Sequence, residues 1–64
     1  MTKTQLIDYF RANEGCRHKA DVARKLDMSP QSLNNAPEGL NKYYMDCAIV
    51  YFARSGKKVP KEFL

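Results

Sequence analysis

The sequence predicts an all-α protein, a compact bundle of four to five short helices that forms one domain over residues 1–64. Two observations favour this class. Apolar residues recur at three- and four-residue spacing in successive segments, and the three glycines and three prolines fall between those segments. A chain of 64 residues also buries only about 60% of its unfolded surface, which supports one modest core and no deep pocket.

The first helix is predicted from about Thr4 to Asn13. Thr2 or Thr4 can cap its start, because a threonine hydroxyl accepts a hydrogen bond from an N–H group of the first turn. Gly15 suits the position just past a helix end. The apolar stripe of this helix consists of Leu6, Ile7, Phe10 and, in part, Tyr9.

Two further helices follow in close succession. The second runs from His18 or Lys19 to Leu26. The third begins at Ser29-Pro30, because serine is a strong N-cap and proline is favoured at the first helical position. It reaches about Asn35, where a nearby proline limits it. Such a short helix is not stable alone, so it must pack against the second helix.

The last helix is predicted over Lys42–Arg54, with Asn41 as its cap. The side chains of this helix are apolar on most of its sides. This pattern indicates either that the helix is buried on most faces or that one face binds a partner. Ser55-Gly56 ends it. The C-terminal tail, residues 55–64, either adds a helical turn from Pro60 or extends as an arm.

Residues 19–36 form one unit, two helices joined by the turn Asp27-Met28-Ser29. Ala23 lies where the helices cross, Met28 fills the gap beneath the turn, and Leu33 anchors the second helix to the first. A helix-turn-helix requires this placement, and the stretch resembles the motif of the lambdoid phage Cro/repressor superfamily. Asp27 stands where that family usually has glycine, and aspartate tolerates the left-handed conformation better than most residues.

The resemblance implies a lambda-repressor-like DNA-binding domain whose third helix lies in the major groove of double-stranded DNA. Glutamine and asparagine pair with adenine through two hydrogen bonds, and serine bonds to either base type. The alternative is that these polar side chains are only solvated. By position, the base-reading residues are Gln31, Ser32 and Asn35, with Ser29 and Asn34 at the margin.

Phosphate contacts are expected at the starts of two helices, because helix N-termini offer free N–H groups to phosphate. The net charge of +4 also favours a polyanionic partner. Lys57, Lys58 and Lys61 either contact the DNA backbone or only solvate the tail. The phosphate-binding candidates are Arg17, His18 and Lys19 at the second helix, and Asn41, Lys42 and Tyr43 at the last.

A weak homodimer is also expected, because operators are usually read by twofold dimers. The outer face of the last helix and the end of the tail are the candidate surfaces. The alternative is that Phe63 and Leu64 fold back onto their own core. The candidate interface residues are Tyr44, Ile49, Phe52, Phe63 and Leu64.

Other classes of function are not favoured. His18 is the only histidine and the carboxylates are dispersed, so we expect no enzyme, catalytic residue, cofactor or small-molecule substrate. Cys16, His18 and Cys47 match no zinc-site spacing, so no metal is expected. No apolar run has the roughly 20 residues of a membrane span, and no signal peptide is evident. We therefore expect no membrane partner and a cytoplasmic location in a bacterial host cell.

The sequence thus favours a transcriptional regulator that reads operator half-sites, a Cro-like repressor of phage or prophage origin. Two alternatives stay open. One is a helical protein-interaction module, an antirepressor or host-factor inhibitor that does not read DNA sequence. The other is an architectural DNA-binding protein without sequence preference.

Overall fold

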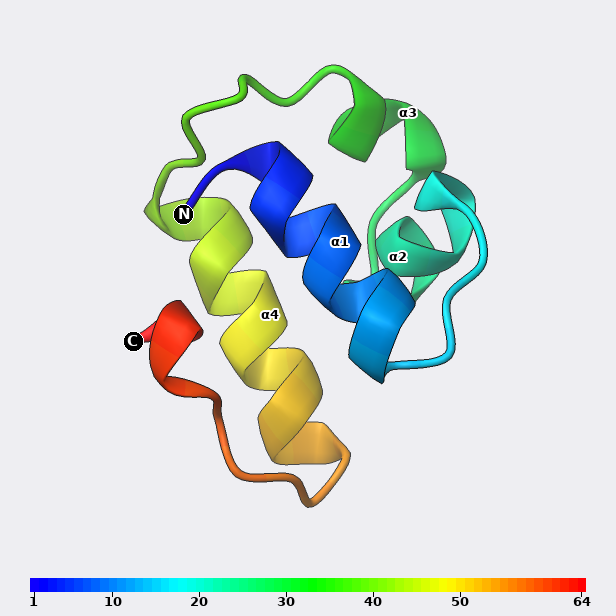
Figure 1. The fold of residues 1–64 in the computed structure, drawn as a ribbon. Helices are drawn as coiled ribbons and strands as arrows, with labels where there is room; N and C mark the ends of the chain where they lie inside the picture. Colours follow the sequence, from blue (N-terminus) through cyan, green and yellow to red (C-terminus); the bar gives the residue numbers. More distant parts are fainter.

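The computed structural model describes residues 1–64, and its regular elements are all helices joined by loops (Figure 1). It contains four α-helices and one short 3₁₀-helix but no strand, which confirms the predicted all-α class. A single isolated bridge pairs Thr2 with Gly39. The elements in chain order are α1 (Lys3–Asn13), α2 (Lys19–Lys25), α3 (Pro30–Asn34), α4 (Lys42–Arg54) and η1 (Lys61–Phe63).

Side-chain caps fix where three of these helices begin. The Thr2 hydroxyl accepts from the Gln5 N–H at 3.1 Å, and the Gln5 side chain accepts from the Thr2 N–H at 2.9 Å. The Ser29 hydroxyl accepts from the third residue of α3, and Asn41 Oδ1 accepts from the Tyr43 N–H at 3.0 Å. Each cap satisfies N–H groups that a helix start leaves without a partner. The predicted caps at Ser29 and Asn41 are confirmed, and of the two alternatives for α1 it is Thr2 that caps.

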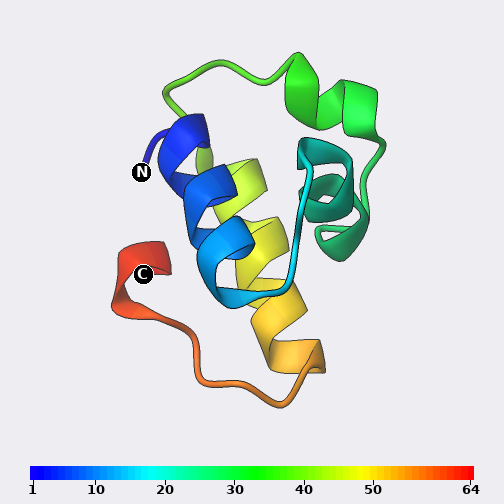
Figure 2. The same cartoon turned by 45° about the vertical axis from the view of Figure 1, so that its right-hand side comes forward.

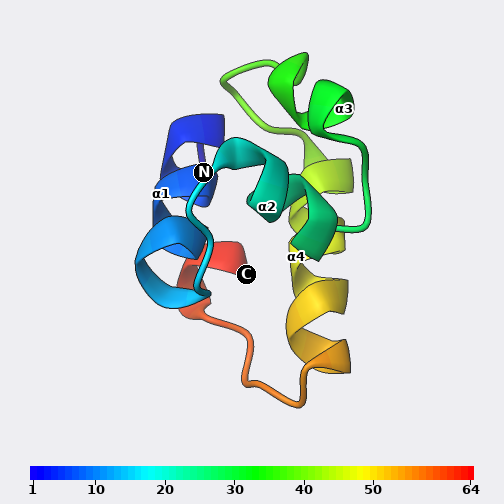
Figure 3. The same ribbon diagram turned by 90° about the vertical axis from the view of Figure 1, so that its right-hand side faces the viewer.

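An aromatic cluster forms the centre of the core. Helices α1 and α4 lie side by side, and α2 covers one flank of the pair (Figures 1–3). Phe10 of α1, Phe52 of α4 and Phe63 of η1 are buried, with ring centroids 5.2–6.1 Å apart. Tyr9 and Tyr51 pack around them at ring separations of 5.2–5.3 Å. Aromatic pairs at these separations add to the free energy gained from burial alone.

The C-terminal tail folds back onto this core, so part of the predicted dimer surface is wrong. Pro60 precedes η1, whose turn is closed by the Phe63 N–H donating to the Pro60 carbonyl at 3.0 Å. Phe63 and Phe52 are only 2% and 1% exposed, so both belong to the core of one chain and cannot serve as an exposed dimer surface. Tyr44 and Ile49 are half-buried. Of the tail candidates only Leu64 stays exposed, at 84%.

A nearly buried carboxylate connects the end of α1 to α4 and the tail. Glu14 accepts hydrogen bonds from the Tyr51 hydroxyl at 2.7 Å and from Lys57 Nζ at 2.6 Å. Its side chain is 6% exposed. Burial alone raises the pKa of Glu14, but the hydrogen bonds from Lys57 and Tyr51 outweigh that effect and hold the pKa below its ordinary value. Lys57 is therefore engaged within the chain.

The longest helix, α4, has 13 residues. No helix combines the length and the apolar character that crossing a membrane requires.

Candidate nucleic-acid interface

The turn between α2 and α3 depends on one left-handed residue. Asp27 has φ +58°, and it is the only residue other than glycine with a positive φ. Reversal at this point lets the Met28 N–H donate to the Ala23 carbonyl at 3.0 Å, which closes the end of α2. Aspartate thus takes the conformation expected at the position where the family usually has glycine. The sharp turn brings α3 against α2.

Small and branched side chains hold the two helices together. Ala23 and Val22 of α2 and Leu33 of α3 are fully buried. Met28 is half-buried and packs against the same core, as predicted. Because α3 has only five residues, these contacts and not its intrinsic stability keep it helical. The result is a short helix fixed on its inner side and open on its outer side.

The outer side of α3 carries amide side chains. Gln31, Asn34 and Asn35 are exposed, and their side-chain amides make no hydrogen bond within the chain. The helix has no acidic or basic residue of its own. In Figures 1–3 it lies at one end of the molecule, away from the C-terminal tail. The structure therefore places three of the five predicted base-reading side chains together, exposed and unpaired.

The two remaining candidates, Ser29 and Ser32, are partly occupied. Ser29 Oγ accepts from the Ser32 N–H at 3.1 Å, and the two hydroxyl oxygens lie 2.8 Å apart. Helix capping therefore accounts for Ser29. The Ser32 hydroxyl keeps capacity for one further bond, because a hydroxyl both donates and accepts.

A lysine that the sequence reasoning did not single out holds the far end of α3. Lys3 Nζ donates to the carbonyls of Asn34 at 3.1 Å and Ala36 at 2.8 Å. A cation is favourable there, because the last carbonyls of a helix lack partners and carry partial negative charge. The only feature of the sequence that could have indicated this contact is the lack of a capping residue after α3. That feature does not identify which cation binds the free carbonyls.

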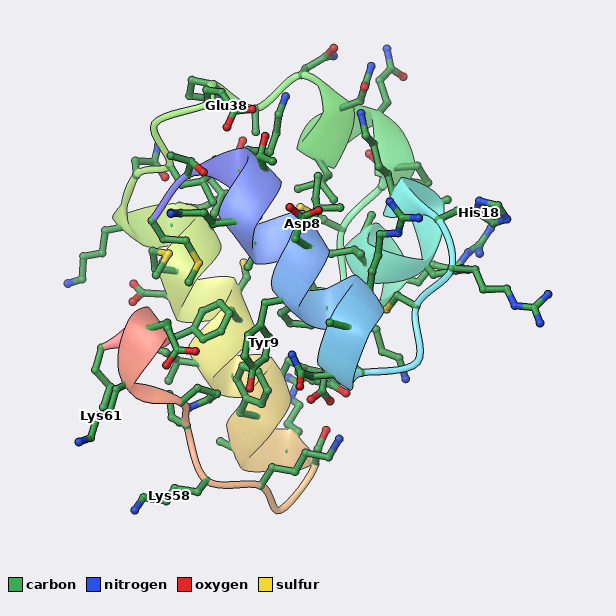
Figure 4. All side chains as sticks on the ribbon, viewed as in Figure 1. Asp8, Tyr9, His18, Glu38, Lys58 and Lys61 are labelled. Carbon is green, nitrogen blue, oxygen red and sulfur yellow. The ribbon has the colours of Figure 1, made fainter.

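The loop that follows α3 is fastened to the start of α1. Glu38 accepts the Thr4 N–H at 3.1 Å and the Thr4 hydroxyl at 3.0 Å through its carboxylate, and the Lys3 N–H at 2.7 Å through its carbonyl. The hydrogen bonds from Thr4 lower the pKa of Glu38. Lys3 and Glu38 together fix the position of α3 relative to α1. Figure 4 shows Glu38 beside the first turn of α1.

The start of α2 differs from the expectation in one respect. Arg17, His18 and Lys19 are exposed, and His18 projects away from the body of the protein (Figure 4). However, Asp21 Oδ2 accepts the N–H groups of both Arg17 and His18 at 3.1 Å. These hydrogen bonds lower the pKa of Asp21, and Arg24 pairs with it at 2.9 Å. The N–H groups of Arg17 and His18 are therefore not free for phosphate, because a carboxylate from the same helix already binds them, whereas the N–H groups of Lys19 and Ala20 have no partner within the chain.

The start of α4 is more open. Asn41 uses its side-chain oxygen as the cap, which leaves its amide N–H groups free to donate. Lys42 and Tyr43 are exposed. Lys58 and Lys61 lie at the opposite end of the molecule from α3 (Figure 4). A duplex that contacts α3 is therefore closer to the start of α4 than to the tail lysines.

The two cysteines differ in burial. Cys16, in the loop before α2, is buried in the core, whereas Cys47 of α4 is only half-buried. Burial raises the pKa of the Cys16 thiol. No group of three or more His, Cys, Asp or Glu side chains gathers in an arrangement that could hold a metal ion.

Comparison of the chain with protein-family models, with curated proteins and with solved structures found no match in any of the three. The resemblance to the Cro/repressor superfamily therefore depends on the residues of the α2–α3 unit alone.

Proposed function

We propose that the chain is a sequence-specific transcriptional regulator that binds double-stranded DNA, a Cro-like repressor of phage or prophage origin. In this proposal α3 enters the major groove and reads an operator half-site. The observation that carries it is the outer side of α3, where Gln31, Asn34 and Asn35 are exposed without partners. An exposed row of amides on the second helix of such a unit matches the donor and acceptor pattern of adenine edges.

The remaining features fit this arrangement. The chain has a net charge of +4, and α3 itself carries no acidic residue that would repel phosphate. Side chains of Arg17, His18 and Lys19 on one flank, and of Lys42 and Tyr43 on the other, are exposed for contact with the DNA backbone. With the N–H groups of Arg17 and His18 occupied by Asp21, the phosphate contacts of these two residues come from their side chains.

Selection of bound sequences from a random duplex library tests the proposal. A consensus half-site is expected, with affinity that falls steeply as salt rises because counterions are released on binding. Gln31→Ala should then lower affinity for the selected site by about 5- to 150-fold, equivalent to about 1–3 kcal/mol, and relax one base position. Asn13→Ala serves as the control, since Asn13 is an exposed amide at the far end of α1.

The outcomes separate the alternatives. Equal affinity for unrelated duplexes would indicate an architectural DNA-binding protein. Operator binding that survives Gln31→Ala unchanged would mean that α3 is not the reading helix. The second candidate function is a protein-interaction module, and the exposed Tyr43 and Val50 on α4 favour it. Absence of DNA binding even at low salt would support that candidate.

A further inference from the structure

An open groove lies between the end of α2 and the outer side of α4, and its volume is about 350 Å³. Val50 and Tyr43 line it although they are 47% and 60% exposed, and the half-buried Cys47 lies between them on α4. Sites for small ligands usually have volumes of about 300–1,000 Å³. We call this feature the α2–α4 groove, and its charged lining residues are Lys25, Asp27, Asp46 and Arg54.

The four charged side chains of the α2–α4 groove have no partner of opposite charge within the chain. All four are exposed, and none takes part in either of the two ion pairs that the chain forms. Two of them are acidic and two are basic, so the groove as a whole is neutral. Its selectivity therefore depends on where along its length each sign of charge lies.

The two carboxylates lie at the end of the groove where α4 begins. Asp46 is three residues, about one helical turn, after Tyr43. Asp27 is on the opposite wall, in the turn that follows α2. The pKa of Tyr43 is raised chiefly by the neighbouring Cys47 thiol and in smaller part by the Asp27 carboxylate, which places Asp27 near the same end.

The two cations lie at the other end of the groove. Arg54 is eight residues after Asp46, a separation of about 12 Å along the helix axis. Lys25 Nζ lies 5.8 Å from the centroid of the Tyr51 ring, and Tyr51 is three residues before Arg54. Lys57 also lies near Tyr51, but Glu14 neutralises it. The groove thus has an acidic end, an apolar middle and a basic end.

This arrangement defines the chemistry of a ligand. The complementary molecule carries a cation at one end, an apolar body and a carboxylate at the other end, with the two charges about 12 Å apart. An extended chain of four residues spans about 13 Å, so a tetrapeptide with free termini has this separation. A whole helix is about 10–12 Å across and does not fit a groove of this volume.

We propose that the α2–α4 groove binds a short free peptide of about four residues with apolar side chains. The peptide is extended, its N-terminal ammonium lies between the two carboxylates, and its C-terminal carboxylate lies between the two cations. Exposed ion pairs change an equilibrium by at most about fivefold each, and binding orders a flexible chain. We therefore expect a dissociation constant of about 0.1–1 mM.

The proposal goes beyond the proposed function and is tested without DNA, so its failure would leave that function untouched. The tetrapeptide Ala-Phe-Leu-Ala with free termini is titrated to about 5 mM, above the expected dissociation constant, into the full ¹⁵N-labelled chain. Saturable shifts of amide resonances are expected at residues of the groove. The N-acetylated peptide and the C-amidated peptide each lack one charge and should bind about three- to fivefold more weakly.

Variants of the protein identify which end of the groove holds which charge. Asp46→Asn should weaken binding of the free peptide about three- to fivefold and leave binding of the N-acetylated peptide unchanged, because that peptide has no ammonium to lose. Arg54→Gln should act in the same way on the C-amidated peptide. Val50→Asp should weaken all three peptides by at least about 10-fold through the apolar middle. Its side chain is half exposed, so the fold is retained.

Matched controls use the exposed pair Asp8 and Arg11 on α1, which lies outside the groove. Asp8→Asn and Arg11→Gln change the net charge by the same amounts as the groove variants and should leave the affinity within about twofold of the original. Absence of saturable shifts in the groove would overturn the proposal, as would capped peptides that bind as tightly as the free one. Groove resonances that shift with protein concentration and not with peptide would also overturn it, because a second copy of the chain would then occupy the groove.

Discussion

The burial of Phe63, one residue from the end of the sequence, gives the sharpest test of how the core is built. The perturbation is Phe63→Ala. Phe63 is 2% exposed, and its ring lies 5.2 Å from Tyr9, 5.2 Å from Phe52 and 6.1 Å from Phe10. Leu64 is 84% exposed, so Leu64→Ala is a control at the adjacent position.

The expected loss in the free energy of unfolding follows from the burial and the contacts of the Phe63 side chain. Removing a buried phenylalanine side chain costs about 3–5 kcal/mol in a protein core. The tail recovers part of that cost, because the freed residues regain conformational entropy of about 1 kcal/mol each. We therefore expect Phe63→Ala to lower the free energy of unfolding by about 2–3 kcal/mol. A domain of this length has a total of only about 3–10 kcal/mol, so the loss is a large fraction of the whole.

Thermal and urea unfolding, followed by far-ultraviolet circular dichroism, measure the effect. A loss of this size should lower Tm by about 10–20 °C, whereas Leu64→Ala should stay within about 0.5 kcal/mol of the original chain. Repeating the melts at several protein concentrations separates core packing from association, because only a dimer contact makes Tm depend on concentration. Equal, small effects of the two substitutions would refute the packing of η1 into the core.

Three further outcomes are expected. Asp27→Gly should raise the free energy of unfolding by up to about 0.5 kcal/mol, because φ is +58° at this position and glycine adopts that conformation without strain. Asp27→Ala should lower it by about 1 kcal/mol for the same reason. Equal stability of the two variants in urea titrations would contradict this prediction. Tyr51→Phe should cost about 1.5 kcal/mol by chemical denaturation, because it removes the hydroxyl that donates to nearly buried Glu14. Glu14 and Glu38 have lowered pKa values in the folded state, so their stabilisation is complete above the unfolded pKa and is lost as pH falls through the folded pKa. An acid titration of Glu14→Gln should accordingly show a shallower loss of stability than the original chain, and an unchanged acid limb would count against the ion pair with Lys57.

Local chemistry made most of the helix boundaries predictable. Ser29 and Asn41 cap the helices they were expected to cap, because capping involves residues only two or three positions apart. The reversal at Asp27 was also foreseeable, since few residue types adopt the left-handed conformation. These features need no knowledge of the tertiary fold.

Contacts between distant residues were not predictable in the same way. Lys3 is 31 residues from Asn34, and Glu14 is 43 residues from Lys57, and no periodicity links such pairs. Phe63 was ambiguous for a related reason. A terminal aromatic residue is equally consistent with a dimer contact and with packing into its own core, and only the position of η1 decides between them.

Asp21 shows how one local pattern allows two readings. Basic residues at a helix start suggest phosphate binding, but an acidic residue at the third helical position can bind the same N–H groups first. Here the acidic residue does so, with both Arg17 and His18 N–H groups donating to Asp21. A carboxylate inside the chain is always present at high effective concentration, so it outcompetes a weakly bound external anion for these donors.

Internal pairing also determines which charges reach the surface. Three of the seven acidic side chains, those of Glu14, Asp21 and Glu38, are bound by groups of the chain itself. Three of the 11 basic side chains, those of Lys3, Arg24 and Lys57, are likewise engaged, which leaves eight basic and four acidic groups unpaired. The net charge of +4 is therefore carried by groups that are free to contact a partner.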